Sequence, residues 1–250
     1  SMEGTGMNRG TMEYHVGTER GKGLLLEQVA DVLQVWRDDA YLGTRTCAGE
    51  WVHLPGTGME EERKSDGKMD GKAEGKAEAW RIRVDAWGHS NFDDARLPSL
   101  RIASEKGIQG LYQVDGMHRL NGGWRFRQED TWLPDVLKPL EDPLSPLLSP
   151  NSWNSTRMPL LATYAIRWTV PEGTKACVMH LEGMKAETAV YVNGTWVAML
   201  ASGNPWVDLS HWLKPGEQAE LALHVRKRDW SEPVGIPLLY HLTKLIPEIR

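Results

Sequence analysis

Short runs of alternating apolar and polar side chains constrain the fold of this chain more than any other feature. The clearest runs are 80–84 (WRIRV), 164–170 (YAIRWTV) and 219–225 (AELALHV), and Gly, Pro, Asn and Asp punctuate the chain between them. Successive side chains of a β-strand point to opposite faces, so a period of two predicts half-buried strands. We therefore expect an all-β protein built from many short strands.

Composition excludes several classes of protein. The chain has 250 residues, of which 40% are apolar and 25% charged, so it can bury a sizeable core. Its formal net charge of −5 gives no general attraction to nucleic acid or to anionic lipid. No apolar run approaches the ~20 residues of a membrane-spanning helix. We expect neither nucleic acid nor a membrane as a partner.

The two cysteines, Cys47 and Cys177, lie far apart in the sequence and have no other metal-ligating residues near them. We interpret each as a buried free thiol on a strand rather than as half of a disulfide. The opening Ser1-Met2 is typical of a tag-cleavage scar. Neither the two cysteines nor the first residues indicate in which cellular compartment the protein works.

The chain divides into four segments by composition. Residues 1–10 are read as a tag remnant and flexible arm, and 11–129 as a first β-sandwich with an exposed, charged loop at 57–79. Many prolines and two Ser-Pro steps fill 130–158, and proline cannot donate to a strand ladder, so this segment is a linker or a surface traverse. Residues 159–250 form the second predicted sandwich.

Two turns predict hairpins. Asp38-Asp39 separates two apolar runs in the first half of the chain. In the second half, Asn193-Gly194 separates the apolar runs 189–192 and 195–200. Asn-Gly is a strong hairpin signal because both residues tolerate a positive φ.

One stretch resembles a known family. The polar corner at 87–92 (WGHSNF) and the later Lys106-Gly107-Ile108 resemble the non-catalytic β-domains that follow the barrel in family 35 glycoside hydrolases, the β-galactosidase family. This corner departs from the family pattern in its extra residues 93–98 and in His89, where the family more often has a basic residue.

A second resemblance lies in the other half of the chain. Residues 181–194 and 210–217 (SHWLKPGE) resemble the galactose-binding-like jelly-roll domains of family 2 and family 35 enzymes. Fainter copies are present at 29–32 and 38–43. The resemblance implies two tandem jelly-roll, galactose-binding-like β-sandwiches joined by the Pro-rich segment.

Catalytic motifs are missing from the sequence. Retaining glycosidases use two carboxylates about 5 Å apart, usually on the strand ends of a barrel, and no β/α alternation predicts a barrel here. There is no HExxH spacing, no G-x-S-x-G elbow and no phosphate-binding loop. We expect this chain not to be an enzyme and to use no cofactor. A structural calcium site or an acid/base role for Asp93-Asp94 is an alternative to hydrogen bonding within the corner or pairing with Arg96.

Sugar recognition is the chemistry that remains. The chain has twelve Trp but only two Phe, and tryptophan stacks on the apolar faces of sugar rings, although it also fills sandwich cores. Two clusters combine such rings with polar side chains. The first comprises Trp87, His89, Asn91, Asp94 and Arg96, and the second comprises Trp196, Asn204 and Trp206. The alternative interpretation is that these corners only pin one sheet to the next.

Together these observations predict a non-catalytic, carbohydrate-binding accessory region of a β-galactosidase-like glycoside hydrolase. Its expected partners are a galactoside or polysaccharide and the catalytic barrel of a parent enzyme. Two alternatives stay open: a free-standing carbohydrate-binding module or lectin, and a purely structural β-sandwich that docks onto protein. Fold analogy carries much of this prediction, and a fold alone does not establish function.

Overall fold

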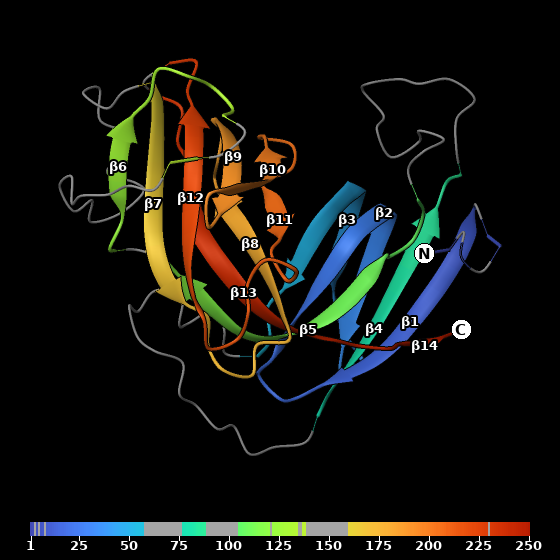
Figure 1. Ribbon diagram of the computed structural model, residues 1–250. Coiled ribbons are helices and arrows are strands. Elements are labelled where there is room, and N and C mark those ends of the chain that lie inside the picture. The colour runs from blue at the N-terminus through green and yellow to red at the C-terminus, as the bar shows by residue number, and fades with distance from the viewer. Residues whose placement is uncertain are drawn as a thin grey trace. The chain divides into compact units, whose positions relative to one another are not determined.

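The protein is all-β, as the alternating pattern predicted (Figure 1). The computed structural model describes residues 1–2, 4, 6–7, 9–57, 77–88, 105–120, 122–134, 137–138, 160–229 and 231–250. Within these ranges every named element is a β-strand, and every strand pairing with a given register is antiparallel. No helix of the described part is long and apolar enough to cross a membrane.

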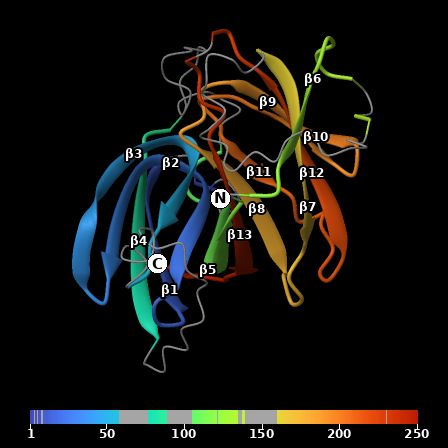
Figure 2. The same ribbon diagram turned by 90° about the vertical axis from the view of Figure 1, so that its left-hand side faces the viewer.

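The chain forms two compact units, and the first comprises Ser1–Asp115 together with Thr243–Arg250. Its strands are β1 (Gly10–Thr18), β2 (Gly23–Arg37), β3 (Ala40–Leu54), β4 (Glu78–Ala86), the first part of β5 (Gly110–Arg119) and β14 (Glu248–Ile249). They are ordered β5-β2-β4-β1-β14, with β3 on the other edge of β2. Figures 1 and 2 show β1 to β4 as long, curved strands lying side by side.

Alternate residues of these strands supply the core of the first unit. On β4, the side chains of residues 78, 80, 82, 84 and 86 are buried while those between them are more exposed. Trp80, Ile82 and Val84 pack in one cluster with Leu33 and Val35 of β2. The cross-strand pairs Leu33–Val84 and Val35–Ile82 place these side chains on one face.

The second unit, Gly116–Leu242, is a two-layer sandwich. One sheet has the order β11-β8-β13 and the other β10-β9-β12-β7-β6. The strands are β6 (Arg125–Gln128), β7 (Leu161–Thr169), β8 (Ala176–Glu182), β9 (Glu187–Val192), β10 (Thr195–Leu200), β11 (Trp206–Asp208), β12 (Gln218–Arg226) and β13 (Ile236–Lys244). Their inward side chains, among them Tyr164, Met179, Val190, Leu223 and Leu239, form one buried cluster.

The outer face of the five-stranded sheet is covered by part of the segment that we predicted as a linker or surface traverse. Tyr191 donates its hydroxyl hydrogen to Pro134 O (2.8 Å), and Leu137 N–H donates to Gly194 O (3.0 Å). The ring of Trp132 stacks on His224 at 5.1 Å between centroids. The described residues of this segment are therefore fixed to the sheet, and the rest of 130–158 lies outside the described residues.

The boundaries of the two units differ from the predicted ones at 129 and 159. Residues 125–128 form β6, which pairs with β7 and so belongs to the second unit. At the other end, β14 pairs with β1, and Leu245 N–H donates to Leu111 O (2.8 Å), so the C-terminal residues belong to the first unit. A two-residue exposed strand has no pattern from which a sequence could assign its partner.

Two strands run longer than the apolar runs in the sequence. Residues 23–27 and 31–36 belong to one strand, β2, which continues past an irregularity in its pairing with β3, where Gln28 has φ 48°. Residues 116–118 continue β5. Glycine is rarer in strands, but β5 accommodates Gly116 without a break.

Other local predictions are confirmed. The hairpins at Asp38-Asp39 and Asn193-Gly194 both form, and the four residues have positive φ values of 47°, 64°, 50° and 80° in that order. Both cysteines are buried free thiols, Cys47 on β3 and Cys177 on β8.

Candidate carbohydrate-binding sites

The first predicted site begins at Trp87, directly after β4. Its side chain is 59% exposed. Its backbone N–H donates to Asp31 Oδ2 at 2.7 Å. The same carboxylate accepts from Lys106 Nζ at 3.0 Å (Oδ1) and 3.2 Å (Oδ2), and both members of this ion pair are fully buried. The buried charge pair therefore fixes the backbone that carries this exposed aromatic ring.

The Lys-Gly-Ile element that carried part of the resemblance now has a structural explanation. Lys106 supplies the buried ammonium, and Ile108 N–H donates to the Tyr14 hydroxyl (3.4 Å). Between them, Gly107 has φ 87°, and a Cβ there would lie 2.7 Å from Met2 Cγ and 2.8 Å from Tyr14 Oη. Only glycine fits this backbone and this close approach.

The polar members of this predicted cluster cannot be placed. His89, Asn91, Asp94 and Arg96 lie outside the described residues, as does the Asp93-Asp94 pair that we considered for calcium. Trp87 is thus the one predicted sugar-contact residue of this corner that the structure describes.

The second predicted site lies at the β9–β10 hairpin. Trp196, on β10, is 47% exposed and pairs with Tyr191 of β9, so both side chains stand on the outer face of the five-stranded sheet. A polar hollow of about 270 Å³ adjoins the hairpin and is lined by Arg167, Asn193, Gly194, Gln218, Ala219 and Glu220. Asn193 Oδ1 accepts from Glu220 N–H (2.9 Å), which holds the hairpin against β12.

The other two residues of the second cluster have different surroundings. Trp206 is only 9% exposed, because its ring stacks on His180 at 4.0 Å between centroids, with 4° between the planes, and tilts against Tyr240. Its burial favours a packing role over the sugar contact that we predicted. Asn204 is exposed in a tight turn, where its N–H donates to Ala201 O (2.8 Å).

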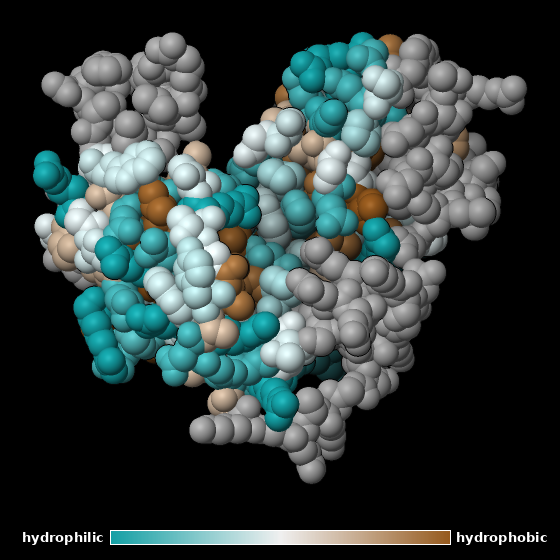
Figure 3. Space-filling model, turned by 180° about the vertical axis from the view of Figure 1, so that it is seen from behind, coloured by the Kyte–Doolittle hydropathy of each residue, from teal (hydrophilic) through white to brown (hydrophobic). Residues whose placement is uncertain are grey.

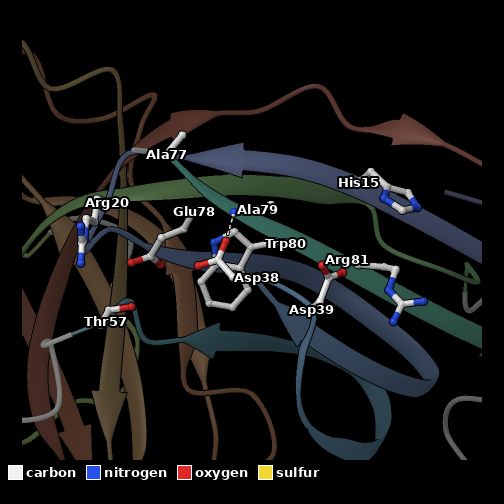
Figure 4. Close-up of a pocket in the computed structure, with 10 residues that line it drawn as sticks. All are labelled: His15, Arg20, Asp38, Asp39, Thr57, Ala77, Glu78, Ala79, Trp80 and Arg81. Atoms are coloured by element: carbon white, nitrogen blue, oxygen red, sulfur yellow. Dashed lines mark hydrogen bonds between the residues drawn. The ribbon is translucent and has the colours of Figure 1, made fainter. Parts of the chain in front are cut away.

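A larger cavity lies at the start of β4 and was not predicted. It measures about 670 Å³ and is lined by His15, Arg20, Asp38, Asp39, Thr57, Ala77, Glu78, Ala79, Trp80 and Arg81 (Figure 4). The lining comes from His15 of β1, from the first four residues of β4, and from residues outside the strands, among them the β1–β2 and β2–β3 turns. We call this cavity the β4 pocket. Its volume is in the range of small-molecule sites, about 300–1,000 Å³.

Within the β4 pocket, the carboxylates differ in their hydrogen bonds. Asp38 Oδ1 accepts from Ala79 N–H (2.9 Å), the dashed line in Figure 4. Glu78 is 3% exposed, and its Oε1 accepts from Gly21 N–H (2.9 Å). Its Oε2 is buried and has no hydrogen-bond partner in the part of the chain that the structure describes. A buried polar atom without a partner is unfavourable by about 1–3 kcal/mol.

The sequence held a signal for Glu78 that our prediction missed. We placed residue 78 in the exposed, charged loop at 57–79, but it is the first residue of β4. Extending the alternation of β4 back from Trp80 by two positions places Glu78 on the inward face. A charged residue on the apolar face of a predicted strand would have marked this position.

An aromatic pair, Trp36 and Tyr41, lies beside Arg81 on the outer face of the sheet. The guanidinium carbon of Arg81 lies 4.1 Å from the ring centroid of Trp36, whose own ring is 5.3 Å from that of Tyr41. Tyr41 is 55% exposed.

Figure 3 shows hydrophobic residues as small areas among hydrophilic ones on the visible face. In the part of the chain that the structure describes, no group of three or more His, Cys, Asp or Glu could hold a metal ion.

Similar solved structures are glycoside hydrolases. The chain aligns with a β-glucuronidase of an uncultured Clostridium species at a TM-score of 0.39 and 16% identity, over 50% of this chain and 29% of that one. A glycosyl hydrolase family 2 member from Bacteroides cellulosilyticus gives 0.43 and 16%, over 51% and 20%. The β-glucuronidase of Faecalibacterium prausnitzii gives 0.39 and 16%, over 50% and 31%.

This chain therefore spans less than a third of the length of these three enzymes. No protein-family model and no curated protein sequence matches it. At these scores and identities the similarity does not assign the chain to a family. None of the three structures is described as a member of family 35, so that part of the resemblance stays a prediction.

Proposed function

We propose that this chain is a non-catalytic accessory region of a glycoside hydrolase, which binds a galactoside or a polysaccharide and positions a catalytic barrel. The observation that carries the proposal is the exposure of two tryptophan rings that sequence analysis selected as sugar platforms. Trp87 is 59% exposed and Trp196 is 47% exposed. Exposed rings of this size on a β-sandwich surface favour a ligand with flat apolar faces.

The backbone beside each ring is fixed by hydrogen bonds. The Trp87 N–H donates to Asp31, which is itself paired with Lys106. Trp196 lies in a hairpin whose Asn193 is bonded to β12. A backbone that is already ordered loses little conformational entropy on binding, so more of the stacking energy contributes to affinity.

The antiparallel architecture supports a non-catalytic role. A (β/α)₈ barrel needs parallel strands alternating with helices. The described part of the chain has antiparallel strands and no α-helix. A catalytic barrel, where the resemblance to family 35 and family 2 domains implies one, would therefore be a partner of this region.

A titration of the chain with β-galactosides and with a panel of polysaccharides tests the proposal. Trp87→Ala or Trp196→Ala should weaken binding about tenfold, because an aromatic contact is worth about 0.5–1.5 kcal/mol beyond its buried area. Trp212→Ala is the matched control, since Trp212 is 40% exposed but lies outside both predicted clusters. No saturable binding to any glycan, or equal losses in all three variants, would contradict the proposal.

A further inference from the structure

The β4 pocket carries an inference that goes beyond the two tryptophan platforms. Its starting point is Glu78, which is 3% exposed and whose Oε2 has no hydrogen-bond partner among the described residues. Figure 4 shows its carboxylate pointing to the side of the pocket where Arg20 and Thr57 lie. A ligand with an N–H or O–H donor would satisfy this oxygen.

The other side chains of the β4 pocket narrow the class of ligand. Asp39 is a second carboxylate on the lining, and it makes no hydrogen bond or ion pair with the described residues. Arg20 and Arg81 supply donors but no acceptor, and Thr57 supplies a hydroxyl group. The pocket thus presents acceptors and donors together.

This mixture of carboxylates and guanidinium groups disfavours ligands that carry charge of only one sign. An inorganic anion would meet Arg20 but would lie among Asp38, Asp39 and Glu78. A polyamine would satisfy the carboxylates but would face two guanidinium groups. A hydroxyl group both donates and accepts a hydrogen bond, so a neutral ligand with several hydroxyls can match both kinds of partner.

We propose that the β4 pocket is a binding site for a neutral saccharide, with Glu78 Oε2 accepting a hydrogen bond from a ligand hydroxyl and Arg20 donating to ligand oxygens. The inference rests on the proposed function only in that both expect a carbohydrate. It concerns a different site.

Glu78→Gln is the main test. The glutamine keeps the size of the side chain, and its carbonyl oxygen can still accept from Gly21 N–H, but its other atom becomes an amide donor. The variant replaces a buried charged carboxylate by a neutral amide of the same shape, which is less costly to bury, so it should unfold at the same temperature as the original protein or higher. Its affinity for a neutral saccharide should nevertheless fall at least tenfold.

The titration uses galactose, lactose and β-1,4-galactobiose as ligands, with spermidine and inorganic phosphate as charged comparisons. Glu50→Gln is the matched control, because Glu50 lies in the same unit and already accepts from Arg45 Nη2 (3.2 Å). It should leave affinity unchanged. Arg20→Ala, which removes an exposed side chain outside the core, should weaken binding without affecting folding.

The outcomes separate this site from the tryptophan platforms. Saccharide binding that is lost in Glu78→Gln and Arg20→Ala but retained in Trp87→Ala and Trp196→Ala supports the β4 pocket. Saccharide binding that is unchanged in both pocket variants overturns this inference, even if a tryptophan variant loses affinity and so supports the proposed function. Binding of spermidine or phosphate alone, or of no ligand, also overturns it.

Discussion

At the scale of single residues, the buried pair of Asp31 and Lys106 ties together three parts of the first unit. The two side chains are fully buried and 3.0 Å apart, and Asp31 also accepts from the backbone of Trp87. Burying charges is costly, so such a pair is tolerated only when both members are present and hydrogen-bonded. The pair joins β2, the end of β4 and the Lys-Gly-Ile element.

Lys106→Met should lower the free energy of unfolding by about 3–5 kcal/mol, because it leaves the Asp31 carboxylate buried without its counter-ion. Urea denaturation at neutral pH measures the change. The double variant Asp31→Asn with Lys106→Met removes both charges and should recover part of the loss. A single variant within about 1 kcal/mol of the original protein would contradict a structural role for the pair.

The two cysteines predict how stability changes at high pH. Burial raises the pKa of Cys47 to about 12 and that of Cys177 to about 12, from an ordinary value of 9.0. Between pH 9 and 12 the folded protein keeps protons that the unfolded chain releases, so the free energy of unfolding should fall as pH rises. The stabilisation that the two protonated thiols provide is fully present below pH 9. Denaturation curves from pH 8 to 11 measure the slope.

Cys47→Ala and Cys177→Ala provide the comparison for this prediction. Each variant should show a shallower decline with pH than the original protein, since it removes one of the two titrating thiols. Identical slopes in the original protein and in both variants would mean that other groups control stability in this range.

At the scale of elements, the β9–β10 hairpin depends on its Asn-Gly turn. Gly194 has φ 80°, a conformation that is unfavourable by about 1–2 kcal/mol for residues with a Cβ. Gly194→Ala should therefore lower the free energy of unfolding by about that amount, measured by urea denaturation. Gly203→Ala is the control, because Gly203 has no positive φ and open space around its Cα. Equal effects of the two substitutions would contradict this account of the turn.

At the scale of the whole molecule, the division into units predicts which part depends on the C-terminus. Thr243 Oγ1 donates to Asp115 Oδ2 (2.6 Å), and Arg250 exchanges two backbone hydrogen bonds with Glu13. Removing residues 243–250 should speed hydrogen exchange of β1 amides while those of β7, β9 and β12 stay protected. Equal exchange in the two units, or a change confined to the second, would contradict the assignment of this segment.

The sequence predicted the strands and both hairpins because alternation and turn chemistry are local. The buried partner of Asp31 was missed because Lys106 is distant from it in the sequence, whereas Glu78 was missed because we assigned residue 78 to the charged loop. Lys106 reads as a surface charge in a polar stretch, and nothing near it indicates that it lies against β2. The pairing of β14 with β1 was missed for the same reason. Of the predicted sugar contacts, Trp87 and Trp196 are exposed, whereas the burial of Trp206 depends on His180 from another strand.

The most direct test of the central claim is an equilibrium titration of the intact chain with β-galactosides and polysaccharides, followed by hydrogen exchange of the saturated complex. The account predicts saturable binding of a neutral glycan and slower exchange around Trp87, Trp196 or the start of β4. A chain that binds none of these glycans, or that binds one without protecting any of these regions, would contradict a role in carbohydrate recognition.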